Sequence, residues 1–243
     1  SSTVNIFKNG EIENISKNLN DHSIGYFFAE TTKSLGLKAF EHEFKVMGMA
    51  PYSSTEDVNR ILKNLDNLIF LGNDGKFYSK VVSSLFKYEI DKIFKYEKFE
   101  NICGAAQVFT ENLVIKWIQF WIKKTSINNI ILSGGVFMNI KACKELSELD
   151  AVNEILIVPS SSDESLPFGA LYKINKLNNQ KISITKNLYL GLSYSKDIDK
   201  FINKLDKKKF VVKKYENFEN LNSYAAELIA KNNIIARCSG REE

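Results

Sequence analysis

The sequence is poor in the residues that build several common kinds of site. Its 243 residues include only 3 Cys, 2 His and 3 Pro. Cys103, Cys143 and Cys238 are scattered and form no C-x-x-C pair, which excludes a disulfide scaffold and a cysteine zinc site. Reduced thiols of this kind favour a cytoplasmic protein. His22 and His42 lie too far apart to build a histidine metal cluster from this chain alone.

Long apolar runs are also missing, and no stretch approaches the ~20 residues of a membrane span. The net charge is +4, from lysines spread along the chain. The clusters Lys207–Lys209 and Lys213–Lys214 lie in no recognisable nucleic-acid motif. A solvated, lysine-rich surface is therefore favoured over nucleic-acid binding, and the chain is expected to bind neither nucleic acid nor membrane.

The hydrophobic pattern predicts an α/β protein. Asn9-Gly10 and Asn73-Asp74-Gly75 predict two hairpins. An aromatic face with a spacing of about 3.6 residues marks the clearest helix, and its aromatic residues are expected in the core rather than at a ligand. Helices are predicted over 23–34, 41–50, 55–64, 83–94, 105–122, 136–147, 165–175, 197–204 and 221–230, and strands over 4–7, 11–15, 68–71, 76–79, 129–132, 154–158, 210–214 and 233–238.

Two of these strands each end in a polar loop. The run Ile130–Leu132 leads into Ser133-Gly134-Gly135 and then a helix, a turn in which backbone N–H groups can approach a phosphate. The run Ile155–Val158 leads into Pro159 and the acidic loop 160–165. Parallel strands that deliver loops at their carboxyl ends build ligand sites in open α/β sheets. By itself, a Gly-Gly turn is more often only a tight turn.

The order of elements predicts the second lobe of an actin-like ATPase-type domain. Alternating hairpins and helices are followed by two strand–loop–helix units, and such folds bind nucleotide between lobes. Residues 176–187 are polar and read as a linker. Beyond them, the predicted helices and strands begin a second α/β unit. Both ends of the sequence look cut, which indicates a piece of a longer protein.

Six motifs resemble those of ATP-dependent O-carbamoyltransferases of the nodulation-factor and antibiotic-modifying types. Glu43–Tyr52 resembles the signature E-x-K-V-M-G-L-A-P-Y-G of that family. The other matching segments, in the order in which the family carries them, are His22–Gly25, Gly104–Gln107 with Glu111, Leu132–Asn139, Pro159–Ala170 and Gly240–Glu243.

The resemblance implies a domain order and an activity. Residues 1–177 would be the latter part of the actin-like domain, 178–187 a linker, and 188–243 the start of a YrdC-like domain. Such enzymes use ATP and carbamoyl phosphate to form carbamoyladenylate with loss of pyrophosphate. They then transfer the carbamoyl group to a hydroxyl, usually of a sugar or sugar-bearing metabolite.

The resemblance places a divalent metal, iron or magnesium, at Asp163. A cation that bridges phosphates prefers a carboxylate oxygen at a strand end. The alternative is that Asp163 merely caps the following helix. Ser162 and Ser165 stand where the family has Gly, so this loop is expected to have less access to positive φ.

By the same resemblance, Gly134 and Gly135 meet nucleotide phosphates through their backbone amides. Asn139 lies one helical turn further on and would touch the nucleotide, with a helix-surface amide as the alternative. Glu43 and Lys45 would contact ribose or phosphate, with a pair of solvated charges as the alternative.

Arg241 matches an arginine that clamps carbamoyl phosphate or its adenylate, and the alternative is a solvated terminal side chain. The family's H-x-x-x-H pair and its F-G-P-R-A-L-G loop do not occur in these 243 residues, so residues 1–243 alone are expected to be inactive. Two other functions stay open: a sugar kinase of actin-like fold, and a noncatalytic or tRNA-modifying relative.

Overall fold

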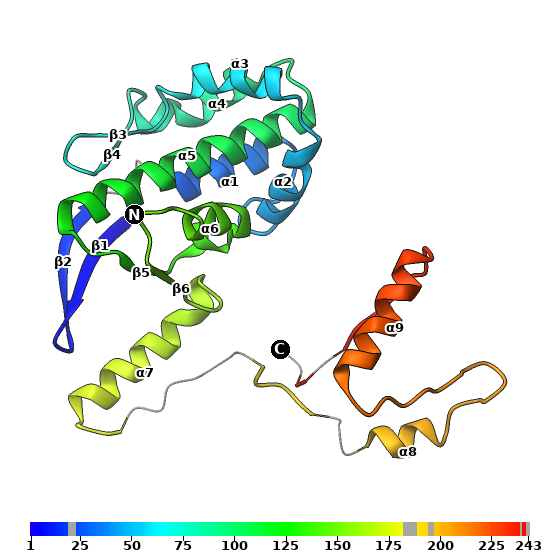
Figure 1. The fold of residues 1–243 in the computed structure, drawn as a ribbon. Helices are drawn as coiled ribbons and strands as arrows, with labels where there is room; N and C mark the ends of the chain where they lie inside the picture. Colours follow the sequence, from blue (N-terminus) through cyan, green and yellow to red (C-terminus); the bar gives the residue numbers. More distant parts are fainter. Residues whose placement is uncertain (19–22, 182–188, 194–196, 239, 242–243) are drawn as a thin grey trace. The chain divides into compact units, whose positions relative to one another are not determined.

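The computed structural model of this chain describes residues 1–18, 23–181, 189–193, 197–238 and 240–241. The chain divides into two compact units, Ser1–Gln180 and Lys181–Glu243, and each is described by itself. The larger unit mixes helices with short strands (Figure 1), which confirms the α/β class. Its assignment to an actin-like lobe stays a prediction.

The elements of the larger unit follow the predicted order. The strands are β1 (Ser2–Lys8), β2 (Glu11–Asn18), β3 (Phe70–Leu71), β4 (Phe77–Tyr78), β5 (Asn129–Leu132) and β6 (Glu154–Ile157). The helices are α1 (Ile24–Ser34), α2 (Glu43–Met49), α3 (Thr55–Leu65), α4 (Phe86–Phe94), α5 (Phe99–Thr125), α6 (Ile140–Ser147) and α7 (Leu166–Leu177). Single 3-10 turns are η2 (Ala50–Tyr52), η3 (Ser83–Leu85), η4 (Gly135–Met138) and η5 (Asp163–Ser165).

Local sequence signals explain the hairpins and the start of α1. β1 and β2 pair antiparallel across Asn9 and Gly10, which both have positive φ, as a tight two-residue hairpin turn requires. β3 and β4 pair antiparallel around the second predicted turn. The hydroxyl of Ser23 accepts a hydrogen bond from the backbone N–H of Tyr26 at 3.3 Å, so Ser23 is the N-cap of α1.

The core is built around α5, the long helix that runs through the middle of the larger unit with α1, α2 and α3 beside it (Figure 1). The side chains on its predicted aromatic face are core residues, as expected: Phe109, Leu113, Trp117 and Trp121 are buried, and Phe120 packs against them. Both Trp indoles donate to the carbonyl oxygen of Gly75 in the β3–β4 turn, at 3.2 and 3.3 Å. These two indole N–H hydrogen bonds therefore hold the β3–β4 hairpin against α5.

Close backbone packing at Gly104 holds α5 against the start of α3. A Cβ built on Gly104 would lie 2.8 Å from Cγ2 of Val58 and closer still to the side chain of Ser53. Real Cβ atoms do not approach other atoms so closely, so a larger residue here would push the two elements apart. This glycine lies in one of the six motifs, and its role in the fold is packing.

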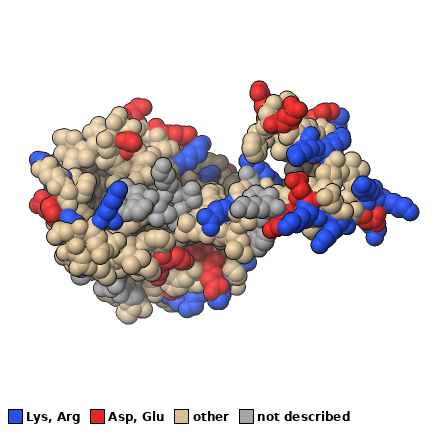
Figure 2. Space-filling model, turned by 90° about the horizontal axis from the view of Figure 1, so that it is seen from below, with Lys and Arg blue, Asp and Glu red and all other residues tan. Residues whose placement is uncertain are grey.

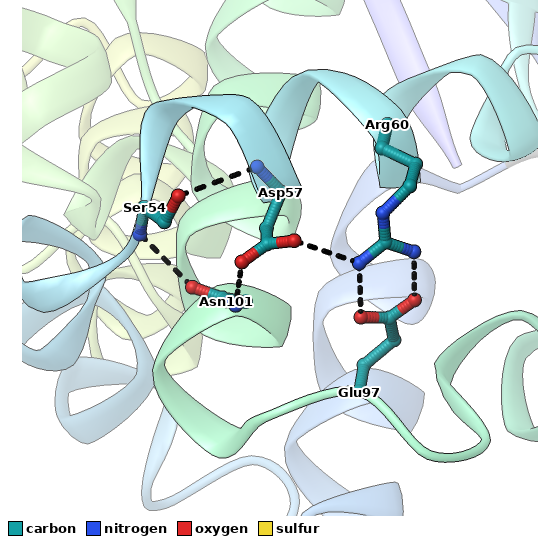
Figure 3. Close-up of polar contacts among 5 residues, drawn as sticks. All are labelled: Ser54, Asp57, Arg60, Glu97 and Asn101. Carbon is teal, nitrogen blue, oxygen red and sulfur yellow. Dashed lines mark hydrogen bonds and ion pairs between the residues drawn. The ribbon is translucent and has the colours of Figure 1, made fainter.

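A polar network joins the same elements at their surface (Figure 3). Arg60 on α3 pairs with Asp57 at 2.9 Å and with both carboxylate oxygens of Glu97, which precedes α5. Asn101 donates to Asp57 at 2.8 Å and accepts from the backbone N–H of Ser54 at 2.9 Å. The hydrogen bond from Arg60 lowers the pKa of Asp57, with further contributions from the charge of Arg60 and from Asn101.

The smaller unit holds α8 (Ile198–Ile202) and α9 (Phe218–Ala230), which confirms two predicted helices. The predicted strands 210–214 and 233–238 are wrong, because neither segment is a strand in the structure. A strand needs a hydrogen-bonded neighbour, and none of the smaller unit's described residues forms one. None of its described residues is buried either. Its assignment to a YrdC-like domain stays a prediction.

Candidate functional site

The two strands predicted to carry the site are neighbours. β5 and β6 pair in parallel, with Ile130 opposite Ile155 and Leu132 opposite Ile157. The ladder continues for one further bond, from the N–H of Val158 to the carbonyl of Leu132 at 2.9 Å. Because both strands run in the same direction, their following loops leave the sheet at one edge. The paired arrangement predicted from sequence is confirmed.

The turn after β5 needs its first glycine. Gly134 has a φ of +117°, a conformation that side-chain-bearing residues rarely adopt. Its N–H donates to the carbonyl of Ser161 at 2.8 Å, so the turn after β5 is tied to the loop after β6. The backbone amide of Gly134 therefore joins the two loops. Gly135, the first residue of η4, is more exposed than Gly134.

The loop after β6 reaches its shape without the family's glycines. Ser162 is extended, with a φ of −89°, and the left-handed residue is instead Ser160, with a φ of +50°. Asp163 is exposed and begins η5, which runs into α7. Ser162 is the N-cap of η5 and Ser165 is the N-cap of α7, so Asp163 is not the helix cap that was the alternative.

Four of the predicted site residues line one cleft of about 1060 Å³ in the larger unit: Glu43, Gly135, Asn139 and Asp163. Several of the lining residues lie at the starts of helical segments. Ser23 and Gly25 lie at the start of α1, Gly135 begins η4, Asn139 precedes α6, and Asp163 begins η5. Backbone N–H groups at helix starts create positive potential, which suits phosphate or carboxylate groups. The apolar residues Phe40, Phe44, Met47 and Met138 also line this cleft.

Asn139 is held by the neighbouring helix. Its side-chain oxygen accepts from the N–H of Ala142 at 3.1 Å, which caps α6. Its amide also exchanges two hydrogen bonds of 2.9 Å with Gln107 on α5, and Gln107 donates in addition to Glu111 at 2.7 Å. Asn139 is therefore a positioned cap between two helices rather than a loose surface amide.

Glu43 and Lys45 differ in their placement. Glu43 lines the cleft, and its Oε1 accepts a 2.6 Å hydrogen bond from the backbone N–H of Phe40. This bond supports Phe40 in a left-handed conformation, with a φ of +65°, that is unfavourable for a bulky side chain. Lys45 is exposed, lies outside the lining of the cleft, and has its ammonium 5.8 Å from the ring centre of Phe44.

Two further predicted residues, Gly134 and Arg241, have other surroundings within their own units. Gly134 lines a smaller cavity of about 180 Å³, together with Ser133 and Val136. Arg241 belongs to the smaller unit, where its guanidinium donates to the carbonyls of Gly191 at 2.8 Å and Leu190 at 3.0 Å. Its predicted role stays a prediction.

The cleft lining offers carboxylate oxygens, among them those of Asp163, as possible ligands for a metal ion. Within the described part of the chain, no three His, Cys, Asp or Glu residues gather closely enough to hold an ion. His22, quoted in a motif, lies outside the described residues. A single carboxylate beside phosphates is how Mg²⁺ is commonly held, with water completing its shell. The exposed carboxylate of Asp163 is compatible with this kind of ligation, and the metal itself stays a prediction.

The charge of the molecule is divided unevenly between the two units. Residues 181–243 hold 13 of the 33 Lys and Arg residues and 8 of the 29 Asp and Glu residues, so the lysines are less evenly spread than the sequence pattern indicated. On the face seen in Figure 2, basic and acidic side chains of this unit are interspersed. Among the described residues, no helix combines the length and apolarity needed to cross a membrane.

Sequence reasoning missed several residues of the cleft. Thr110 on α5 and Phe40 before α2 both line it, and Gln107 holds Asn139 from outside the lining. Gln107 was present in a motif, but its partner is 32 residues away and no local pattern connects the two. Tyr26 also lines the cleft; burial raises its pKa, and Glu30 adds to that effect.

Comparison with known proteins identifies the class. The family model described as "Carbamoyltransferase N-terminus" matches residues 2–171, and the chain belongs to this carbamoyltransferase family. An uncharacterised protein of Methanocaldococcus jannaschii, MJ1051, is 26% identical over 91% of this chain and 43% of its own length. Nodulation protein NolO of Bradyrhizobium diazoefficiens is 24% identical over 63% of this chain and 28% of its own length.

A second uncharacterised relative, sll1178 of Synechocystis, is 26% identical over 91% of this chain and 39% of its own length. The chain therefore spans about two-fifths of the length of the first of these curated relatives.

Proposed function

We propose that this chain is part of an ATP-dependent O-carbamoyltransferase that acts in the cytoplasm. In the proposed reaction, ATP, carbamoyl phosphate and one water give carbamoyladenylate, pyrophosphate and phosphate; the water supplies the oxygen with which phosphate leaves the carbamoyl group. The carbamoyl group then passes to a hydroxyl of a small-molecule acceptor such as a sugar. Family membership supports the transferase class. The observation that carries the choice of ATP is the cleft, where the start of η4 and Asp163 lie together.

The nucleotide phosphates would bind at the starts of the helical segments. There the backbone of Gly135 and the start of α1 at Gly25 offer N–H groups and helix-end potential to anionic oxygens. A magnesium ion bound with the nucleotide would neutralise phosphate charge, and the carboxylate of Asp163 would hold it. The Oε1 atom of Glu43 accepts from the backbone N–H of Phe40, and its other carboxylate oxygen would accept from a ribose hydroxyl.

The chain's contribution to catalysis would be mainly positioning and electrostatic stabilisation. Gln107 fixes Asn139, and Gly134 ties the two loops together, so the groups around the phosphates are held before ligand arrives. Arg241 would add a planar guanidinium that suits the oxygens of carbamoyl phosphate or its adenylate. No covalent enzyme intermediate is proposed, because Cys103 and Cys143 are buried and the pKa of each thiol is raised.

Product analysis tests this proposal against a sugar kinase. The full-length protein is incubated with ATP and magnesium, with or without carbamoyl phosphate, and the phosphorus-containing products are identified by nuclear magnetic resonance. Carbamoyl-phosphate-dependent pyrophosphate supports the carbamoyltransferase. ADP that forms when sugars are added, without pyrophosphate, would instead indicate the kinase.

The tRNA-modifying alternative draws on a different feature, the excess of Lys and Arg in residues 181–243. Binding that depends on phosphate contacts weakens steeply as salt increases. Retention of tRNA at 50 mM salt that disappears at 200 mM, together with no pyrophosphate release, would favour that alternative.

A further inference from the structure

The hydroxyl of Thr110 is buried and has no hydrogen-bond partner among the described residues. Thr110 lies on α5, is 1% exposed and is one of the residues that line the cleft. A buried polar group without a partner destabilises a fold, which makes such a group beside a cleft a candidate for a ligand contact.

Other helical threonines of this chain show the usual arrangement. Thr32 donates to the carbonyl of Phe28 at 2.9 Å, and Thr125 donates to that of Trp121 at 2.7 Å. Both bonds run back four residues along the same helix, which is the common way to satisfy a threonine in a helix. Thr110 does not make the corresponding bond to the carbonyl of Ala106, and its Oγ1 has no partner among the described residues.

The surroundings of Thr110 indicate what the hydroxyl would meet. One helical turn before it, Gln107 holds Asn139 at the start of α6. Gly135 and the start of α1 at Gly25 line the same cleft. Each of these backbone segments suits an anionic oxygen, and a threonine hydroxyl is a donor that can add to them.

On the basis of the proposed function, we infer that Thr110 is a binding residue that donates a hydrogen bond to a phosphate oxygen of the nucleotide in the cleft. The bond replaces the one that Thr110 does not make within the protein. Ligand-free protein would therefore carry an unsatisfied hydroxyl that is satisfied only in the complex.

Replacement of Thr110 by valine tests this inference, because valine has nearly the same shape and no hydroxyl. In the full-length protein, Thr110→Val should leave the ligand-free melting temperature unchanged or raise it. It should weaken the binding of magnesium-ATP, measured by calorimetry, by about tenfold, as expected for a lost hydrogen bond to a charged group. Thr110→Ser keeps the hydroxyl and should bind magnesium-ATP within about twofold of the parent.

Thr31 provides a matched control. Its Oγ1 is also buried without a partner among the described residues, on α1, but Thr31 is not part of the cleft lining. Thr31→Val should also leave the melting temperature unchanged or raise it, and it should not change magnesium-ATP binding. If Thr110→Val does not fold, Thr110→Ala removes the same hydroxyl without placing a methyl in its position.

The possible results separate the two proposals. Equal magnesium-ATP affinity in the parent and in Thr110→Val would overturn the assignment of Thr110 and leave the proposed function standing. An equal loss of adenosine affinity would also overturn it, because adenosine has no phosphate. A parent that does not bind magnesium-ATP at all would contradict both the proposed function and the inference.

Discussion

The side-chain amides of Gln107 and Asn139 hydrogen-bond to each other in both directions, with each N···O distance 2.9 Å. Gln107 is 2% exposed and lies in the first half of α5, whereas Asn139 caps α6. The pair therefore fixes the helix that follows the Gly134–Met138 turn against the central helix of the unit. A turn that must present backbone groups to a ligand benefits from such preorganisation.

The pair should show measurable energetic coupling. We expect Asn139→Ala to destabilise the protein by about 1 kcal/mol or more, because α6 loses its cap. Gln107→Ala should cost roughly 1–3 kcal/mol, because a buried amide partner is removed. In a double-mutant cycle by urea unfolding, the coupling energy should be about 1–2 kcal/mol.

The matched control for this cycle is another amide pair, Asn129 and Asn153, which hydrogen-bond at 2.8 Å but are both exposed. Their coupling should be below about 0.5 kcal/mol, because water replaces the lost bond. Equal coupling in the two pairs would contradict the positioning role of Gln107.

Gly104 should tolerate no side chain. Gly104→Ala places a methyl group against Ser53 and Val58, and we expect a loss of roughly 1–3 kcal/mol in the free energy of unfolding. Gly48, on α2, is the control, because a Cβ there has nothing within 4 Å. Gly48→Ala should be neutral or stabilise by up to about 1 kcal/mol through helix propensity. A similar effect of the two changes would show that the packing at Gly104 is looser than described.

Asp57 should make stability depend on pH in acid. Its pKa is lowered below 3.8 in the folded state, first by the hydrogen bond from Arg60. The stability that it contributes is therefore present above about pH 4 and is lost as the pH falls through the lowered pKa. Chemical unfolding between pH 5 and 2 should show a shallower decline in Asp57→Asn than in the parent. Parallel profiles for the two proteins would contradict a folded-state role for this ionisation.

The three thiols should differ sharply in reactivity. Burial raises the pKa of Cys103 to about 11, with a smaller contribution from Glu100, and burial also raises the pKa of Cys143. Cys238 is exposed. Because the thiolate is the reactive form, iodoacetamide at pH 8 should label Cys238 in native protein and all three cysteines in urea. Rapid native labelling of Cys103, detected by mass spectrometry, would contradict its burial.

The raised pKa of Cys103 should also make stability depend on pH in alkaline solution. Between about pH 9 and 11 the unfolded chain loses the Cys103 proton while the folded chain keeps it, so stability should fall with rising pH in this window. Cys103→Ser, which does not titrate there, should show a smaller decline. Identical declines in both proteins would assign the effect to other groups.

The larger unit could be predicted well from sequence because its signals are local. Asn9-Gly10 predicted a hairpin, Ser23 a helix start, and the apolar run that ends at Leu132 a strand followed by a turn. The same approach failed at 210–214 and 233–238, where β-prone residues were present but no strand partner was. Strand formation depends on a neighbour, and composition does not reveal one.

At the candidate site too, the features set by local sequence could be predicted and those set by long-range contacts could not. Local motifs were enough to bring Glu43, Gly135, Asn139 and Asp163 into one prediction, and all four line the cleft. The contacts that decide their roles are long-range: Gly134 bonds to the loop after the next strand, and Asn139 bonds to a helix 32 residues earlier. Thr110 carried no sequence signal at all, because only the fold makes its hydroxyl an unsatisfied group in a cleft.

The most direct test of the account is pyrophosphate release from ATP by the full-length protein, with carbamoyl phosphate present, in the parent and in Asp163→Asn. The neighbouring Glu164, which also lines the cleft, supplies the control Glu164→Gln. The account predicts carbamoyl-phosphate-dependent release that falls at least tenfold in Asp163→Asn, on the order of the loss of a metal-site contact, and that persists in Glu164→Gln. Unchanged release in Asp163→Asn, or no release by the parent, would contradict it.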